Sequence, residues 1–259
     1  MTHDLLVTRD GGVLRMTIDR PEKLNALTRS TIDALRSGFE EAGRDAATRV
    51  IVLTGTGRAF CAGQDLGDPS IVPGSDLGEV LERHYNPLVR AMRELEKPVL
   101  ARVNGIAAGA GANLAFACDI VLAGASATFV ESFSRIGLLP DSGGTWMLPR
   151  LIGHARAVAL AMLGSPLDAR QAYEWGAIWK VVPDGELDAA CDELAHALSR
   201  APTKALGAIK AAMAASWSQD LGAQLETERN AQRALGATRD FHEGVEAFAR
   251  KREPSFRGE

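Results

Sequence analysis

Short apolar runs that alternate with glycine-rich turns constrain the fold of this chain most. RVIVLTG (residues 49–55), PVLARVNG (98–105) and DIVLAG (119–124) are β-branched and end in turn residues, which predicts three buried strands. GAGANLAFACD (109–119), between the second and third runs, has the small residues of a closely packed helix. This alternation of strands and helices predicts an α/β fold with its strands in layered units.

The segments before these runs predict a hairpin and an amphipathic helix. LLVTRD and VLRMTIDR flank the tight-turn signal Asp10-Gly11-Gly12, which predicts an N-terminal β-hairpin. Within residues 28–41, Ile32, Leu35 and Phe39 fall at helical spacing. A further helix is expected over residues 79–96, after a mobile loop that the proline and glycine of residues 71–78 predict.

From Gly143 onward the pattern becomes helical, apart from the short strand WKVV (179–182). Ala201-Pro202 predicts a boundary between a core of residues 1–200 and a helical region of residues 201–259. That helical region is too small to fold alone. We therefore expect it to pack on the core or on another subunit.

Composition excludes several classes of function. The 259 residues carry a net charge of -4 with Lys and Arg scattered, which argues against nucleic acid and membrane partners. The three cysteines are widely spaced and form no CxxC, so reduced thiols and a cytoplasmic location are expected. No signal peptide is recognisable, and the five histidines lack metal-ligand spacing, so no metal site is predicted.

Two small-residue turns, FCAGQDL (60–66) and GAGANL (109–114), carry the first chemical signal. GAGANL lacks the third glycine of a dinucleotide fingerprint. Instead, such turns leave backbone N–H groups unshielded, and these groups can stabilise an oxyanion. Within the first turn, Cys61 has no neighbouring histidine and is expected to be a small buried residue, whereas Asp65 is either an acid or, more simply, a turn cap.

Glu131 and Asp141 are the candidate carboxylates near the Gly143-Gly144 turn of GLLPDSGGTW. For Asp141 two interpretations stay open. An aspartate before Ser-Gly-Gly-Thr is a good helix N-cap, and it is also a group that can move a proton.

Five stretches in order resemble the enoyl-CoA hydratase/isomerase, or crotonase, superfamily. They are RPEKLNALT (20–28), GRAFCAGQDL (57–66), KPVLARVNGIAAGAGANLAFACDIVLA (97–123), GLLPDSGGTWMLPRLIG (137–153) and DFHEGVEAFARKREPSFRG (240–258). The resemblance implies a spiral of repeated ββα units with a C-terminal helical trimerisation region, and hence a trimer or a dimer of trimers. It also implies an acyl-CoA thioester substrate, with no separate cofactor because CoA is part of that substrate.

The resemblance also implies roles for individual residues. The N–H groups of Ala62 and Ala110 are expected to form the oxyanion hole, and Gly63, Gln64 and Asp65 to line the substrate site beside them. Lys23 is expected to meet the CoA phosphates, and Lys251 to do so from a neighbouring subunit.

Members of the superfamily differ in the acidic residues of their active sites. A hydratase uses two glutamates, and their positions correspond here to Asn113 and Phe133, which argues against hydration. Asp141 stands where isomerases have their acid and where a dehalogenase branch has a nucleophilic aspartate. Asn113 is expected to line the acyl pocket, and Phe133 and Trp146 to form apolar walls that raise the pKa of Asp141.

One subgroup is resembled more closely, through FCAGQDL (60–66), HYNPLVRAM (84–92), NGIAAGAGANLA (104–115), GLLPDSGGTWMLPR (137–150) and QAYEWGAIWKVV (171–182). This subgroup isomerises the ring epoxide of 1,2-epoxyphenylacetyl-CoA to oxepin-CoA in aerobic phenylacetate degradation and also shifts the double bond of a dehydroadipyl-CoA. We therefore expect an acyl-CoA isomerase in which Asp141 relocates a proton. Three alternatives stay open: an enoyl-CoA hydratase, an aryl-CoA hydrolase or dehalogenase with an aspartate nucleophile, and a CoA-thioester binder without activity.

Overall fold

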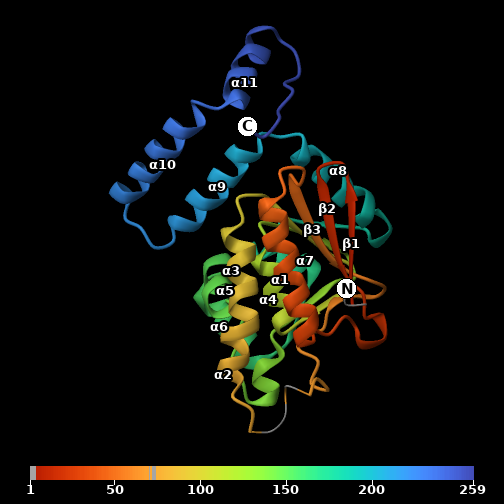
Figure 1. Cartoon of the computed structure of the whole chain (residues 1–259). Coiled ribbons are helices and arrows are strands. Elements are labelled where there is room, and N and C mark those ends of the chain that lie inside the picture. The colour runs from red at the N-terminus through yellow and green to blue at the C-terminus, as the bar shows by residue number, and fades with distance from the viewer. Residues whose placement is uncertain (1–3, 70, 72–73) are drawn as a thin grey trace.

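Two sheets form the framework of the protein in a computed structural model that describes residues 4–69, 71 and 74–259 (Figure 1). The larger sheet has the order β1-β2-β3-β5-β7-β10. Its strands are β1 (Leu5–Asp10), β2 (Val13–Ile18), β3 (Val50–Gly55), β5 (Val99–Val103), β7 (Ile120–Gly124) and β10 (Lys180–Val182). β1 and β2 form the predicted antiparallel hairpin, and the remaining neighbours are parallel.

The smaller sheet has the order β4-β6-β8-β9. Its strands are β4 (Ala59–Cys61), β6 (Ile106–Ala108), β8 (Thr128–Val130) and β9 (Pro166–Asp168). In each of the pairs β3/β4, β5/β6 and β7/β8, the first strand joins the larger sheet and the second joins the smaller one, before a helix follows. This arrangement confirms the ββα spiral. Strand β9 lies in a stretch predicted to be helical; it has three residues and is defined by its pairing with β8 rather than by a local pattern.

Helix α1 (Arg29–Arg44) begins where the sequence indicates, because the Thr28 side chain accepts a hydrogen bond from the Thr31 N–H. The next helical stretch consists of α2 (Leu77–Val80), a π-turn (Leu81–Tyr85) and α3 (Asn86–Glu94). Residues 72 and 73 of the predicted mobile loop lie outside the described residues.

Helices of the later repeats surround the sheets. They are α4 (Ala110–Ala117), α5 (Gly144–Ile152), α6 (His154–Leu163), α7 (Ala169–Glu174) and α8 (Leu187–Ser199). The apolar faces of α1, α3 and α4 meet the sheets in one large core, where Phe39, Met92 and Leu114 are fully buried. All eight residues of α4 are buried, and Asn113 is its one polar side chain. Its first turn packs against the end of β4, since a Cβ atom added at Gly111 would lie 2.2 Å from the Cys61 carbonyl oxygen.

The C-terminal region forms α9 (Thr203–Ala215), α10 (Leu221–Leu235) and α11 (Arg239–Ala249). α10 and α11 extend away from the sheets (Figure 1). Their exposed apolar side chains are Leu221, Leu225, Phe241, Val245 and Phe248. None of the helices in the described part of the chain is long and apolar enough to span a membrane.

Candidate active site

The two small-residue turns lie side by side, because β4 and β6 are parallel neighbours and each turn follows one of them. A Cβ atom added at Gly63, where φ is 89°, would lie 2.6 Å from the Ala108 carbonyl oxygen and 3.4 Å from the Ala110 nitrogen. Only glycine permits this approach. The first turn therefore touches the start of α4, as the prediction of a joint site requires.

The structure corrects one of the two predicted backbone donors. The N–H of Ala62 donates to the Leu24 carbonyl at 2.9 Å, so it is not available to a ligand. Two residues further on, the N–H of Gln64 has no partner within the described part of the chain, and the same holds for the N–H of Ala110 at the first position of α4. The available pair is therefore Gln64 and Ala110.

Asp65 serves the turn itself. Its carboxylate accepts from the Gly67 N–H at 2.9 Å and pairs with Arg20 at 2.9 Å. The Gly67 N–H, and after it the Arg20 guanidinium, hold the pKa of Asp65 below its ordinary value against the opposing effect of burial. The exposed Lys23 adds a positive charge on the same side. The capping interpretation of Asp65 is confirmed, and its carboxylate is engaged in these contacts.

Tyr85 is a site residue that sequence reasoning missed. Its hydroxyl donates to Gln64 Oε1 at 2.6 Å, and the side chain is buried. It stands at the end of the π-turn, a distortion that is frequent at functional sites. Burial, and next the charge of Asp141, raise the pKa of Tyr85. The phenol therefore links the first turn electrostatically to Asp141.

Asp141 does not cap helix α5. That position is occupied by Gly143, with no side-chain hydrogen bond, so the capping alternative is wrong. The half-buried carboxylate accepts from the Ser142 hydroxyl at 2.8 Å, and Ser142 is held in the left-handed region with φ at 50°. Burial raises the pKa of Asp141, and the Ser142 hydroxyl opposes that rise. Such a carboxylate is suited to accepting and returning a proton.

Asn113 is fully buried and holds the loop that carries Asp141. Its Nδ2 donates to the Asp141 carbonyl oxygen at 2.9 Å and to Glu131 Oε2 at 3.4 Å. The expectation that Asn113 lines the acyl pocket is therefore wrong, because the side chain is buried behind the surface and holds the Asp141 loop. Sequence reasoning could have found this only from the burial of α4, since the three residues meet through tertiary contacts.

The two aromatic residues expected at the site, Phe133 and Trp146, differ in how deeply they are buried. Phe133 is buried beside the second turn, with its ring 3.8 Å from the position of a Cβ atom added at Gly109. Trp146 is half-exposed; its ring packs on Trp217, 4.6 Å between centroids, and under the Arg150 guanidinium at 4.5 Å.

Lys251 follows α11 and is exposed, at the end of the C-terminal region. Cys61 is buried, and burial raises the pKa of its thiol to about 12, which makes it a poor nucleophile as expected. Among the described residues no group of three or more His, Cys, Asp or Glu side chains could hold a metal ion.

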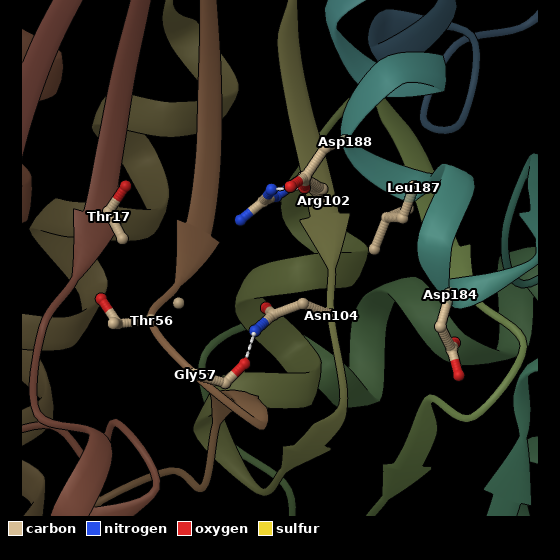
Figure 2. Close-up of a pocket in the computed structure, with 9 residues that line it drawn as sticks. Thr17, Thr56, Gly57, Arg102, Asn104, Asp184, Leu187 and Asp188 are labelled. Carbon is tan, nitrogen blue, oxygen red and sulfur yellow. Dashed lines mark hydrogen bonds and ion pairs between the residues drawn. The ribbon is translucent and has the colours of Figure 1, made fainter.

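A separate cavity of about 430 Å³ lies between the larger sheet and the start of α8 and includes none of the predicted site residues. Figure 2 shows its Arg102 paired with Asp188, and its Asn104 carboxamide donating to the Gly57 carbonyl. The charged groups of this cavity are engaged within the protein, because Arg102 pairs with Asp188 and the Asp184 carboxylate accepts from the Ser126 N–H at 3.0 Å.

Comparisons with known proteins agree with the ββα spiral. The chain matches the family described as enoyl-CoA hydratase/isomerase over residues 8–259. It therefore belongs to that family and is an enzyme of it.

Individual relatives refine the likeness. The chain is 49% identical to a 1,2-epoxyphenylacetyl-CoA isomerase of Escherichia coli, over 95% of each chain. It is 47% identical to a "Probable enoyl-CoA hydratase" of Rhodobacter capsulatus, again over 95% of each. The crystal structure of an enoyl-CoA hydratase from Bacillus anthracis superimposes with a TM-score of 0.95 at 31% identity, covering 99% of this chain and 100% of that one.

Proposed function

We propose that the protein is an acyl-CoA isomerase that converts 1,2-epoxyphenylacetyl-CoA to oxepin-CoA and shifts double bonds in related thioesters. The observation that carries the proposal is the half-buried Asp141, whose pKa burial raises, on the loop that Asn113 ties to helix α4. The likeness to the Escherichia coli isomerase supports the choice of substrate.

In this mechanism the Asp141 carboxylate removes a proton from the carbon next to the thioester. The electron pair moves onto the thioester oxygen, and the resulting enolate accepts hydrogen bonds from the N–H groups of Gln64 and Ala110. Fixed donors aimed at that oxygen lower the barrier because they need no reorganisation as charge develops. Protonated Asp141 then returns the proton at another position, so atoms and charge balance in the double-bond shift. With the ring epoxide, the ring carbon–carbon bond that the oxygen bridges also opens, and its electrons form the double bonds of the seven-membered oxepin ring, so no atom is gained or lost.

The surrounding residues have supporting roles in the proposal. Gly63 lets the two donor turns approach, and Phe133 forms an apolar wall. Lys23, exposed beside the first turn, meets the CoA phosphates. The exposed apolar side chains of α10 and α11 bind further copies of the chain in a trimer or a dimer of trimers, which light scattering on the purified protein tests, and Lys251 reaches CoA in the neighbouring subunit.

Hydration is the second candidate, because the Rhodobacter capsulatus relative is named a hydratase. Hydration needs one group to activate water and another to handle the second proton. The two glutamate positions hold Asn113, which is buried within the wall, and Phe133, which cannot exchange a proton. These residues favour isomerisation.

The proposal is tested by incubating the enzyme with the ring epoxide of phenylacetyl-CoA and following oxepin-CoA. Formation of oxepin-CoA by the wild type, with loss in Asp141→Asn, is the expected result. An aryl ester trapped on Asp141 would instead show the nucleophilic aspartate chemistry. Binding of acyl-CoA without turnover of any thioester would leave a binding protein.

A further inference from the structure

Glu131 is a buried carboxyl group that the proposed mechanism does not use. It lies between β8 and the 3-10 turn Ser132–Ile136, and its exposure is 0%. Oε2 accepts from Asn113 Nδ2 at 3.4 Å, whereas Oε1 has no partner among the described residues. An ionised carboxylate with an unpaired oxygen in the interior carries a large desolvation cost. The neutral acid is the form that this environment tolerates.

Asn113 also has a buried side-chain atom that lacks a hydrogen-bond partner. Both of its Nδ2 hydrogens are accounted for, by Glu131 Oε2 and the Asp141 carbonyl oxygen, but its Oδ1 is buried without a partner in the described part of the chain. A carboxylic acid carries one O–H donor, and a carboxamide oxygen is an acceptor. One proton on Glu131 Oε1 would therefore satisfy both orphaned atoms in a ring of two hydrogen bonds.

We propose that Glu131 is a protonated positioning residue whose acid group pairs with the Asn113 carboxamide and thereby fixes the main chain at Asp141. The inference rests on the proposed function, since its purpose is the orientation of Asp141. The neighbouring Ser142 has a left-handed backbone, which persists only where surrounding contacts hold it. The paired carboxamide supplies such a contact.

The electrostatics of the site agree with this pairing. Burial raises the pKa of Glu131 to about 8; the Asn113 hydrogen bond opposes the rise, and the charge of Asp141 adds to it. The other ionisable groups on the described elements packed around Glu131 are Arg135, His154, Arg156, Asp168, Arg170, Tyr173 and Glu174. The charge that raises the pKa of Glu131 is that of Asp141, which lies outside these elements. Ionising Glu131 would both open the ring and repel Asp141.

Two substitutions distinguish pairing from simple space filling. Glu131→Gln keeps the ring, because its amide donates to Asn113 Oδ1 and its oxygen accepts from Nδ2. Glu131→Met keeps the length but has no group that could donate a hydrogen bond to Asn113 Oδ1. At neutral pH we expect the glutamine variant to retain kcat within about twofold and the methionine variant to lose about tenfold, with KM nearly unchanged in both.

The pH profile supplies the second readout. Wild-type kcat should fall as pH rises through about 8, and this alkaline fall should be absent in Glu131→Gln. A glutamine variant as impaired as the methionine variant, or one that keeps the wild-type alkaline fall, would overturn the proposal.

Infrared difference spectroscopy of wild type against Glu131→Gln tests the protonation without any substrate. The expected result is the band of a protonated carboxylic acid at neutral pH, and its absence there would contradict the proposal. Because the band does not depend on turnover, a protein that shows it but isomerises no thioester would support the pairing and contradict the proposed function.

Discussion

The carboxamide nitrogen of Asn113 and the main-chain carbonyl of Asp141 are joined by a hydrogen bond of 2.9 Å across 28 residues of sequence. Asn113 lies on α4, the helix whose first residue is Ala110. The helix that presents one of the proposed oxyanion donors therefore also holds the loop of the proposed acid. The distance between acid and enolate oxygen is thus set within a buried element rather than by flexible side chains.

Asp141→Asn should lower kcat of isomerisation by about 10³-fold, because asparagine cannot accept the proton. Binding of the thioester should change little, which calorimetry with a product CoA ester checks. Asp168→Asn is the matched control, since it alters an exposed aspartate that caps α7. An Asp141→Asn enzyme with the full isomerase rate would remove the mechanism.

The hydration of crotonyl-CoA should be about 10³-fold slower than the isomerisation of the preferred thioester. The reason is that Phe133, which cannot exchange a proton, stands where a hydratase has its second glutamate. The loss of absorbance of the conjugated thioester measures hydration directly. Robust turnover in this assay would contradict an enzyme limited to isomerisation.

Gly63→Ala should lower kcat by about 10²-fold, since its Cβ would push the Ala108 carbonyl and separate the two donor turns. Gly153→Ala is the matched control. Gly153 has φ at 81°, close to the 89° of Gly63, but an added Cβ would meet nothing within 4 Å. Both glycines have a positive φ that disfavours a side chain, so equal losses of kcat in the two variants would show that backbone strain, not separation of the donors, is responsible.

Tyr85→Phe should lower kcat by about tenfold and leave the fold intact, because it removes the hydrogen bond that orients Gln64. The ring keeps its buried volume, so the melting temperature should shift by only a few degrees. Steady-state kinetics beside a thermal melt check both expectations, and an unchanged kcat would mean that the Gln64 N–H is positioned by its backbone alone.

Stability should depend on pH through Glu131. Its pKa is about 8 in the folded protein against 4.5 as the ordinary value, so its favourable contribution is complete below pH 4.5 and is lost as pH rises through about 8. The melting temperature of the wild type, compared with that of Glu131→Gln, should therefore fall as the pH is raised from 4.5 to about 8. Calorimetry across this range provides the measurement, and a constant difference would exclude a raised pKa.

Local patterns were sufficient for most of the fold. The apolar runs predict β3, β5 and β7, and the helical spacing of Ile32, Leu35 and Phe39 predicts α1, because each of these patterns depends on neighbouring residues. The π-turn that ends at Tyr85 is not predicted. Pro87 was the available signal, since proline lacks the N–H that a regular helix needs there.

The sequence indicates the two turns and the Asp141 carboxylate that make up the candidate site, but not the contacts between them. The motif predicts Ala62 as the first donor, but the Ala62 N–H donates to the carbonyl of Leu24 in a distant segment. Asn113 was assigned to the pocket, whereas its burial turns it into the tie to Asp141. Hydrogen bonds between remote segments leave no periodic trace in a sequence.

The parallel pairing of β4 with β6 has a consequence for how such a site can diversify. Both proposed donors are main-chain groups just past the ends of these adjacent strands, which in any sheet lie about 4.8 Å apart. Their spacing is therefore inherited from sheet geometry and survives almost any side-chain replacement. The acidic residues around these two N–H groups can be exchanged, added or lost one at a time. New reactions can therefore arise while the groups that stabilise the negative charge of the enolate stay in place.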